Sequence, residues 1–301
     1  MVDRTADIEK GNVALNSVLA ALLLTALKIV VGVWSGSLGI LAEAAHSGLD
    51  LLAAIVTLVA VRISSIPADQ NHAYGHGKVE NLSALVETLL LLATCVWIIS
   101  EAVERLTAHN VVVDASIWTF LVMATSIVVD VTRSRMLYRA ARKHRSQALE
   151  ADALHFSTDI WSSAVVIVGL LGVKLAASFP HLDFLRLTDA VAALIVAVIV
   201  VAVSLQLGRR TIQGLLDTAP AGAAGRIKET VEAIDRVDNC HAVRVRQSGP
   251  QYFVDLHILV DGQMTLKDAH ELTERVEQAV QAVLPGADVT VHPEPHMPVA
   301  G

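Results

Sequence analysis

Two histidine–aspartate pairs with the same spacing lie in separate apolar runs of the sequence, His46 with Asp50 and His155 with Asp159. Residues i and i+4 share one face of an α-helix, so each pair presents an imidazole beside a carboxylate. Two such faces supply the two nitrogens and two carboxylates that Zn²⁺ takes in a tetrahedral site. A single pair is equally well explained as a hydrogen bond within its own helix. Repetition favours a shared metal site, because an unpaired aspartate in hydrocarbon costs about 2.5–3.5 kcal/mol.

A second candidate site lies in the polar segment DQNHAYGHGKVE at 69–80, after the first of these runs. Asp69, His72 and His76 form a compact set of metal donors, and Gly75 and Gly77 allow the backbone to fold around an ion. Three protein ligands plus water predict a more exposed and weaker site than four ligands do. The alternative interpretation is a solvated polar loop.

The polar C-terminal part of the chain carries a third group of metal-binding residue types: His241, His257, His270, His292 and Glu294. They fall on different predicted elements, so their spacing does not establish that they converge. Isolated surface histidines are the alternative. Cys240 and His296 either join this group or are only its neighbours in sequence.

The elements that must position these residues are membrane helices. Hydrophobic residues make up 53% of the 301 residues, charged residues 18%, and the mean hydropathy is +0.54. Runs long enough to cross a bilayer, about 20 residues each, recur until roughly Leu207. The sequence therefore predicts six transmembrane helices, at Asn12–Trp34, Leu38–Ile63, Leu82–Leu106, Ser116–Tyr138, Leu149–Ser178 and Thr188–Leu207.

The distribution of basic residues predicts that both termini are cytoplasmic. An even number of spans puts the termini on one side, and that side receives most of the basic residues: Arg4, Lys10, Arg62, Lys78, the Arg133–Arg145 cluster, Arg209 and Arg210. The opposite connections, around Ser35–Ser37, Thr107–Ala115 and Phe179–Leu187, are short. The N-terminus is acidic and mixed, and no removable signal peptide is expected.

Several other charged residues lie in or near the apolar runs: Lys28, Glu43, Glu87, Asp130 and Glu150. None of them repeats as a motif. We expect them to lie near the membrane interfaces or to pair internally. Glu43 or Glu150 is a candidate for assisting ion or proton entry.

The C-terminal part is expected to be a small α+β domain with the order α-β-β-α-β, resembling metallochaperone and ferredoxin-like domains. Its elements are predicted near 223–234, 241–247, 252–260, 266–284 and 288–292, with a hairpin turn at Gly249–Pro250. Apolar residues alternate along the second strand, which predicts one buried and one exposed face. We expect residues 1–214 to form a six-helix transmembrane domain and residues 215–301 a cytoplasmic metal-binding and dimerisation domain.

Composition and motifs exclude or disfavour other classes of protein. The net charge of -7 and the absence of a basic face argue against a nucleic-acid partner. Cys95 and Cys240 form no CxxC pair and indicate no disulfide framework. A zinc hydrolase needs an open coordination position, whereas four ligands close the site, and no HExxH motif occurs. A membrane-anchored metal sensor is another class that the histidines of the C-terminal part suggest. Two metal motifs inside the membrane argue against a membrane half that is only an anchor.

Nearly the whole chain resembles the cation diffusion facilitator family, the bacterial zinc and iron exporters that work as homodimers and exchange metal for protons. The resemblance is carried by HSGLD at 46–50, DQNHAYGHGKVENL at 69–82, ALHFSTD at 153–159, RQSGP at 246–250 and VTVHPEP at 289–295. It implies an integral protein of the bacterial inner membrane that is not an enzyme.

The resemblance also implies a role for each group of residues. His46, Asp50, His155 and Asp159 match the transport site. Asp69, His72 and His76 match a site in the cytoplasmic loop, and the histidines at 241, 257, 270 and 292 match a regulatory cluster. Glu294 falls where bacterial relatives often carry Asp, and Pro293 precedes it, which puts a bridged two-metal centre in doubt. Lys78 and Asp217 look like a charge interlock between the membrane and cytoplasmic halves.

The first transport ligand bears on metal choice. In this family a histidine at position 46 resembles the zinc-selective members, whereas Asp there is associated with iron, cadmium or cobalt. Imidazole also suits zinc better than the harder manganese or magnesium ions. The sequence therefore predicts a Zn²⁺/H⁺ antiporter, and the alternative is a broader exporter of Fe²⁺, Cd²⁺ and Co²⁺.

Overall fold

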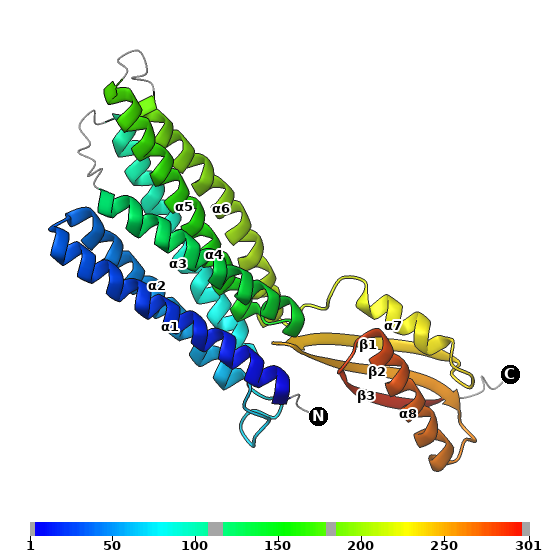
Figure 1. The fold of residues 1–301 in the computed structure, drawn as a ribbon. Helices are drawn as coiled ribbons and strands as arrows, with labels where there is room; N and C mark the ends of the chain where they lie inside the picture. The colour runs from blue at the N-terminus through cyan, green and yellow to red at the C-terminus, as the bar shows by residue number, and fades with distance from the viewer. Residues whose placement is uncertain (1–3, 108–116, 179–184, 297–301) are drawn as a thin grey trace. The chain divides into compact units, whose positions relative to one another are not determined.

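The structure is a computed structural model that describes residues 4–107, 117–178 and 185–296. The chain divides into two compact units, Met1–Ile212 and Gln213–Gly301, each described here by itself. Six long helices build the first unit, the last continuing to Leu215 (Figure 1). They are α1 (Arg4–Ser35), α2 (Leu38–Ser64), α3 (Lys78–Thr107), α4 (Ile117–His144), α5 (Gln147–Ser178) and α6 (Leu185–Leu215).

Each predicted span falls on one of these helices, although Ser116 and most of the connections predicted at Thr107–Ala115 and Phe179–Leu187 lie outside the described residues. Within the described ranges, four segments are long and apolar enough to cross a membrane: Thr5–Ser35, Glu43–Ser64, Lys78–Ser100 and Leu194–Leu215. No segment of α4 or α5 is among these four, which were sought in the described residues alone. Crossing by all six helices therefore stays a prediction.

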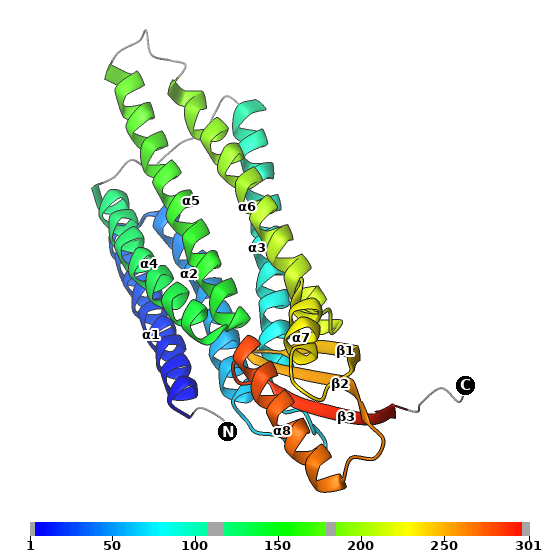
Figure 2. The same ribbon diagram turned by 90° about the vertical axis from the view of Figure 1, so that its right-hand side faces the viewer.

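The helices of the first unit pack in pairs. Helix α1 runs along α2 and α4 runs along α5, and α1 also contacts α4 (Figures 1 and 2). A Cβ at Gly32 would lie 2.8 Å from Leu41 Cδ2, so glycine permits this close approach of α1 and α2. Gly36, at φ +67, turns the chain, and Ser37 Oγ then caps α2 by accepting the N–H of Ile40.

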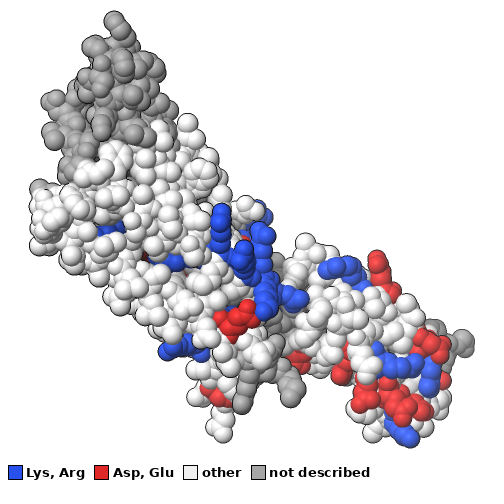
Figure 3. Space-filling view, viewed as in Figure 1, with Lys and Arg blue, Asp and Glu red and all other residues white. Residues whose placement is uncertain are grey.

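Large apolar side chains cover the outside of the long helices. Leu23 and Trp34 are each 70% exposed and Val96 is 67% exposed, which suits a hydrocarbon solvent better than water. Figure 3 shows this largely uncharged surface, with Lys and Arg gathered toward one end of the unit. Arg142 and Lys143, in the last turn of α4, belong to that end.

A buried ion pair joins the helices at the same end. Glu80, in the first turn of α3, is fully buried, and its Oε1 accepts hydrogen bonds from Lys10 Nζ of α1 at 3.0 Å and from Ser64 Oγ of α2 at 2.9 Å. Ser146, between α4 and α5, donates to the other carboxylate oxygen. We call these four residues the Glu80 cluster. Lys10, which the sequence counts among the basic residues of the terminal side, is buried and paired.

The second unit has the predicted α-β-β-α-β order. It consists of α7 (Ala223–Glu232), β1 (Asn239–Ser248), β2 (Gln251–Asp261), α8 (Leu266–Val283) and β3 (Asp288–His296). The strands form one sheet in the order β1-β2-β3, antiparallel between β1 and β2 and parallel between β2 and β3. The predicted hairpin turn is confirmed, since β1 ends and β2 begins around Gly249–Pro250.

One face of this sheet forms the core with the two helices (Figure 2). The buried side chains come from both helices and from alternate positions of β2: Ile227, Val231, Leu272, Val276, Val280, Val254, Leu256, Ile258 and Val260. The intervening Asp255 and His257 point to the other face, as the alternation predicted. That open face holds the histidines described below.

Candidate metal centre

The two histidine–aspartate pairs come together inside the helix bundle. His155 Nε2 of α5 lies 3.1 Å from Asp50 Oδ1 of α2 and 3.8 Å from Asp159 Oδ2. His46 Nε2 lies 3.9 Å from Asp50 Oδ1 and 3.8 Å from Asp159 Oδ1. Ligand atoms about 2.0–2.2 Å from a tetrahedral zinc are about 3.3–3.6 Å apart. Three of the four nitrogen–oxygen distances are 3.8 to 3.9 Å, so the side chains would draw together slightly around one shared ion. The donor atoms of His46, Asp50 and Asp159 lie within 4.8 Å of one another, a set that does not include His155.

Helix geometry and small neighbours explain this convergence. Within each motif the ligands are one turn apart, and the i, i+4 spacing directs both toward the facing helix. Ala53 and Ala54 on α2 and Ala151 and Ala153 on α5 are buried with at most 1% exposure. Ala54 of α2 and Ala153 of α5 share one hydrophobic cluster and occupy little space, which lets the two helices approach closely. Ala151 instead packs with Ala84 of α3 and Leu207 of α6.

Two buried cations near this four-ligand cluster are already paired. Lys28 Nζ lies 3.2 Å from Glu43 Oε2, and Arg133 donates to Asp130 Oδ1 at 3.3 Å. These pairs are formally neutral, so the two ligand carboxylates keep two negative charges for a cation. The prediction that Glu43 and Asp130 pair internally is confirmed, but Arg133 does not belong with the interfacial basic residues. It is 3% exposed, and its guanidinium lies 3.4 Å from the centre of the Phe156 ring.

Two further carboxylates are completely buried beside the cluster. Glu87 of α3 accepts a hydrogen bond from Thr57, and Asp152 of α5 accepts one from Ser17 Oγ at 3.3 Å. One oxygen of each carboxylate has no hydrogen-bond partner among the described residues, and the same holds for His155 Nδ1. Asp152 is not part of a repeated motif, but its place three residues before His155 puts it on the ligand face of α5.

The loop residues Asp69, His72 and His76 also converge. Their donor atoms lie within 4.8 Å of one another, with His72 Nδ1 at 3.3 Å and His76 Nε2 at 3.5 Å from the Asp69 carboxylate. Backbone N–H groups of His72 and Asn71 donate to Asp69 Oδ1, and the former lowers the pKa of that carboxyl most. Asp69 and His72 are exposed, so this cluster differs from the buried one in solvent access.

On the open face of the sheet, three histidines surround Glu294. The Glu294 carboxylate lies 2.8 Å from His257 Nδ1, 3.2 Å from His241 Nε2 and 3.8 Å from His292 Nε2. The strand register explains this, because His241 pairs with His257 and His257 pairs with His292 across the sheet. The hydrogen bond with His257 lowers the pKa of Glu294, so its carboxylate stays ionised.

The remaining residues of this group lie elsewhere. His270 Nε2 contacts Glu274 on its own helix, α8, at 3.6 Å, and the structure does not bring it to Glu294. Cys240 is buried in the hydrophobic core, since β1 alternates and the neighbouring His241 takes the open face. His296 lies 3.3 Å from Asp238. The structure therefore assembles three of the four predicted histidines.

The chain matches the models of a known protein family. The family described as "Cation efflux transmembrane domain" matches residues 14–216, and "Cation efflux protein, cytoplasmic domain" matches residues 220–296. The chain belongs to the cation diffusion facilitator family. It is therefore an integral membrane protein that exports divalent metal cations, and not an enzyme.

Individual relatives agree with this assignment. The cation-efflux pump FieF of Serratia proteamaculans is 33% identical over 285 residues, covering 94% of this chain and 91% of the relative. FieF of Cronobacter sakazakii is 33% identical over 283 residues, with the same coverage. The metal-bound C-terminal domain of the CzcD transporter from Thermotoga maritima is 38% identical over 26% of this chain and 91% of that domain, with a TM-score of 0.24.

The predicted charge interlock of this cation diffusion facilitator involves one residue from each unit. Lys78 is the first residue of α3 in the first unit, and Asp217 follows α6 in the second. Asp217 takes a left-handed backbone conformation, φ 56. The pairing of Lys78 with Asp217 stays a prediction.

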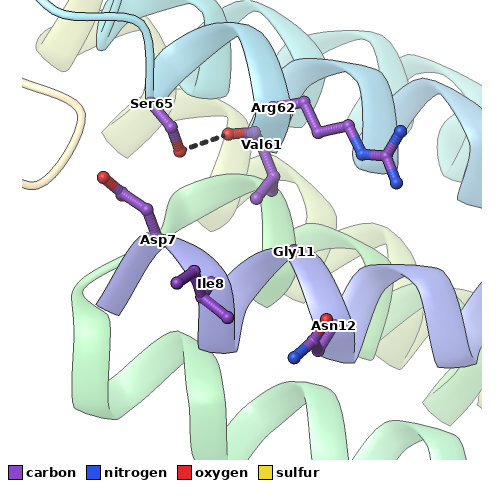
Figure 4. Close-up of a pocket in the computed structure, with 7 residues that line it drawn as sticks. All are labelled: Asp7, Ile8, Gly11, Asn12, Val61, Arg62 and Ser65. Carbon is purple, nitrogen blue, oxygen red and sulfur yellow. Dashed lines mark hydrogen bonds between the residues drawn. The ribbon is translucent and has the colours of Figure 1, made fainter. Parts of the chain in front are cut away.

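A hollow of about 310 Å³ lies between the start of α1 and the end of α2 (Figure 4). Its lining residues are Asp7, Ile8, Gly11, Asn12, Val61, Arg62 and Ser65. Asp7 is paired with Lys10 at 3.2 Å, and Figure 4 shows Arg62 extending away from Asp7. None of the lining residues belongs to a histidine–carboxylate cluster, so this hollow is separate from the candidate metal centres.

We expect zinc binding at Glu294 and its histidines to weaken as the pH falls from 7 to 5.5. A carboxyl whose pKa is lowered in the folded protein loses its contribution only below its ordinary pKa, so Glu294 stays charged throughout this range. Zinc binds only the neutral imidazole, so protons compete with zinc for each histidine nitrogen. The apparent Kd should rise about tenfold per pH unit for each histidine that must lose a proton.

Calorimetric zinc titrations at several pH values measure this, using full-length protein in which Asp69→Ala and Asp159→Ala remove the other two clusters. Glu294→Gln should weaken zinc binding at every pH without moving the pH at which it is lost. Loss of binding only below pH about 4.5 would show that a carboxylate, not histidine, controls the site.

Proposed function

We propose that this cation efflux protein is a Zn²⁺/H⁺ antiporter whose transport site consists of His46, Asp50, His155 and Asp159. The observation that carries the proposal is the convergence of two imidazoles and two carboxylates, with nitrogen–oxygen distances of 3.1 to 3.9 Å. Two neutral imidazoles and two carboxylates bind a dication without residual charge. The imidazoles favour zinc over manganese or magnesium.

Proton coupling follows from the chemistry of the same ligands. Zinc needs the neutral imidazole nitrogen, so a proton on His46 or His155 displaces the metal. In alternating access, the cytosol-facing state loads zinc and the outward-facing state loses it to protons. The partnerless oxygens of Glu87 and Asp152 lie in the same interior and support a region that accepts protons.

The other clusters have supporting roles in this proposal. Asp69, His72 and His76 form a solvent-accessible zinc site, and Glu294 with His241, His257 and His292 forms a regulatory zinc site. His270 joins that site only if α8 moves. Residues 1–214 conduct the ion, and residues 215–301 bind metal and dimerise, with Lys78 and Asp217 linking the two.

The proposed location is the bacterial inner membrane with both termini in the cytoplasm. Lys10 and Arg133 are buried and do not count as surface charges. Without them, most of the basic residues still lie on the side of the termini. They include Arg62, Arg142, Lys143, Arg145, Arg209 and Arg210. The relatives named above are bacterial, which agrees with this location.

Proteoliposomes carrying a pH-sensitive dye test the antiport. A zinc gradient should drive zinc across the bilayer and a proton flux in the opposite direction, and an imposed pH gradient should accelerate zinc uptake. Protein-free liposomes control for leakage. Zinc flux without any proton flux would refute the coupling and leave a uniporter.

Metal choice is tested by His46→Asp in the same vesicles. The family resemblance associates Asp at position 46 with iron and cadmium, so His46→Asp should lower zinc transport relative to Fe²⁺ and Cd²⁺, by about tenfold in the ratio of their kcat/KM values. If the parent carries iron, cadmium and cobalt as well as zinc, the alternative of a broader exporter holds. A membrane-anchored sensor would bind metal and move none.

A further inference from the structure

Side chains of α1 hold the turn of α2 that separates two of the proposed ligands. Thr25 Oγ1 donates to the backbone carbonyl of Ser47 at 3.0 Å, and Lys28 Nζ donates to the Ser47 hydroxyl at 2.7 Å. Ser47 follows His46 directly. Thr25 is 9% exposed and Lys28 is 3% exposed, so both contacts are shielded from solvent. Two donors one turn apart on α1 thus fix a single residue of α2.

Side chains of α4 hold α5 in the same way. Ser134 Oγ donates to the backbone carbonyl of Ala153 at 2.9 Å, two residues before His155. The neighbouring Arg133 lies over the ring of Phe156, which follows His155, at 3.4 Å. Arg133 also donates to Ser17 Oγ at 3.2 Å and thereby ties α4 to α1.

The contacts of α1 with α2 resemble those of α4 with α5. Each ligand helix is held by the helix before it in the chain. A hydroxyl donates to a backbone carbonyl one or two residues from the ligand, and a buried cation contacts the residue that follows the ligand. Helices do not need such bonds, because their carbonyls already accept i→i+4 hydrogen bonds. Buried Lys and Arg are moreover costly in a membrane. These contacts therefore serve to fix where the backbones of α2 and α5 lie.

Fixing the two backbones fixes the size of the ligand cage. Zinc ligands lie at about 2.0–2.2 Å, and a larger ion of the same charge needs every ligand slightly farther out. Helices α2 and α5 must separate if the four ligands are to move outward from the ion. These ligands are His46, Asp50, His155 and Asp159. Contacts that resist this separation raise the cost of binding a larger ion.

We propose that Thr25, Lys28, Arg133 and Ser134 are positioning residues that set the size of the four-ligand cage and so its preference for zinc over the larger cadmium ion. The inference rests on the transport site proposed above. None of the four residues touches the ion; they act through Ser47, Ala153 and Phe156.

The two hydroxyls give the cleanest test, because Lys28 and Arg133 cannot be removed without leaving Glu43 and Asp130 unpaired. Thr25→Val with Ser134→Ala removes both donors at nearly constant volume. We expect the KM for zinc to rise about tenfold with kcat within about twofold, and the zinc-to-cadmium ratio of kcat/KM to fall about tenfold, since each lost hydrogen bond contributes modestly. The matched control, Thr25→Ser with Ser134→Thr, keeps both hydroxyls and should behave as the parent.

Parent protein and Asp159→Ala are measured in the same proteoliposomes. If the parent carries no zinc, or Asp159→Ala carries it as well as the parent does, the proposed transport site itself fails. If that site stands, an equal loss of zinc and cadmium transport in the donor-free variant would mean that the hydroxyls only stabilise the fold, and would overturn the inference. An unchanged zinc-to-cadmium ratio of kcat/KM in a fully active donor-free variant would overturn the inference as well.

Discussion

Asp159→Ala should lower zinc transport in proteoliposomes by about 100-fold or more while leaving the protein folded. The substitution removes one of four ligands and one of the two negative charges that balance the dication. Loss of a group that merely supports a ligand typically costs 10- to 100-fold in metal affinity or activity, so loss of a ligand exceeds that. The Asp159 side chain is only 13% exposed, and water cannot readily replace its carboxylate.

The measurement is the initial rate of zinc uptake at equal protein incorporation. Asp235→Ala makes the same chemical change at an exposed position and should transport like the parent. Size-exclusion profiles in detergent distinguish loss of transport from loss of folding. Wild-type rates in a well-folded Asp159→Ala variant would remove the four-ligand site from the mechanism.

Glu80→Ala should lower the free energy of unfolding by about 3 kcal/mol, because it removes the buried partner of Lys10 and leaves this buried cation only the partly exposed Asp7 at 3.2 Å. Lys10 is 2% exposed and Glu80 is fully buried. The same substitution deprives Ser64 and Ser146 of their acceptor. Since the Glu80 cluster joins α1, α2, α3 and the connection between α4 and α5, its loss should loosen one whole end of the bundle.

Glu150→Ala is the matched control, because Glu150 pairs with Arg210 at 2.7 Å while both side chains are partly exposed. A surface pair of this kind contributes about 0–1 kcal/mol. Lys10→Met combined with Glu80→Gln should recover most of the lost stability, since no charge remains buried in the cluster and Asp7, which loses Lys10, is partly exposed. Unfolding in denaturant with detergent-solubilised protein measures all four proteins. Equal effects of Glu80→Ala and Glu150→Ala would show that the buried pair contributes no more than a surface contact.

Local spacing explains which predictions succeeded. The i, i+4 rule placed His46 beside Asp50 on α2 and His155 beside Asp159 on α5, and strand alternation placed His257 opposite the core. The turn at Gly249–Pro250 and the order of elements in the second unit also follow from neighbouring residues. Helix and strand periods are properties of a short stretch of chain, so a sequence reveals which residues share a face.

Whether a charged side chain is buried could not be predicted from the sequence. Lys10 and Arg133 were counted among the basic residues of the cytoplasmic side, yet both are internal. Asp152 lies outside the repeated histidine–aspartate motif, so its sequence does not mark it as part of the site. Whether a charged side chain on a membrane helix faces solvent or a partner depends on a residue far along the chain: Glu80 for Lys10, and Ser17 and Phe156 for Arg133.

The sequence by itself determined the family, the ligand types and the residues that share each helix or strand face, since these depend on residue identity and short-range spacing. Only the tertiary structure decided which faces meet. It brought α2 against α5, gathered His241, His257 and His292 around Glu294, and left His270 with Glu274. Contacts between distant segments arise from packing of the whole chain, and no local period encodes them.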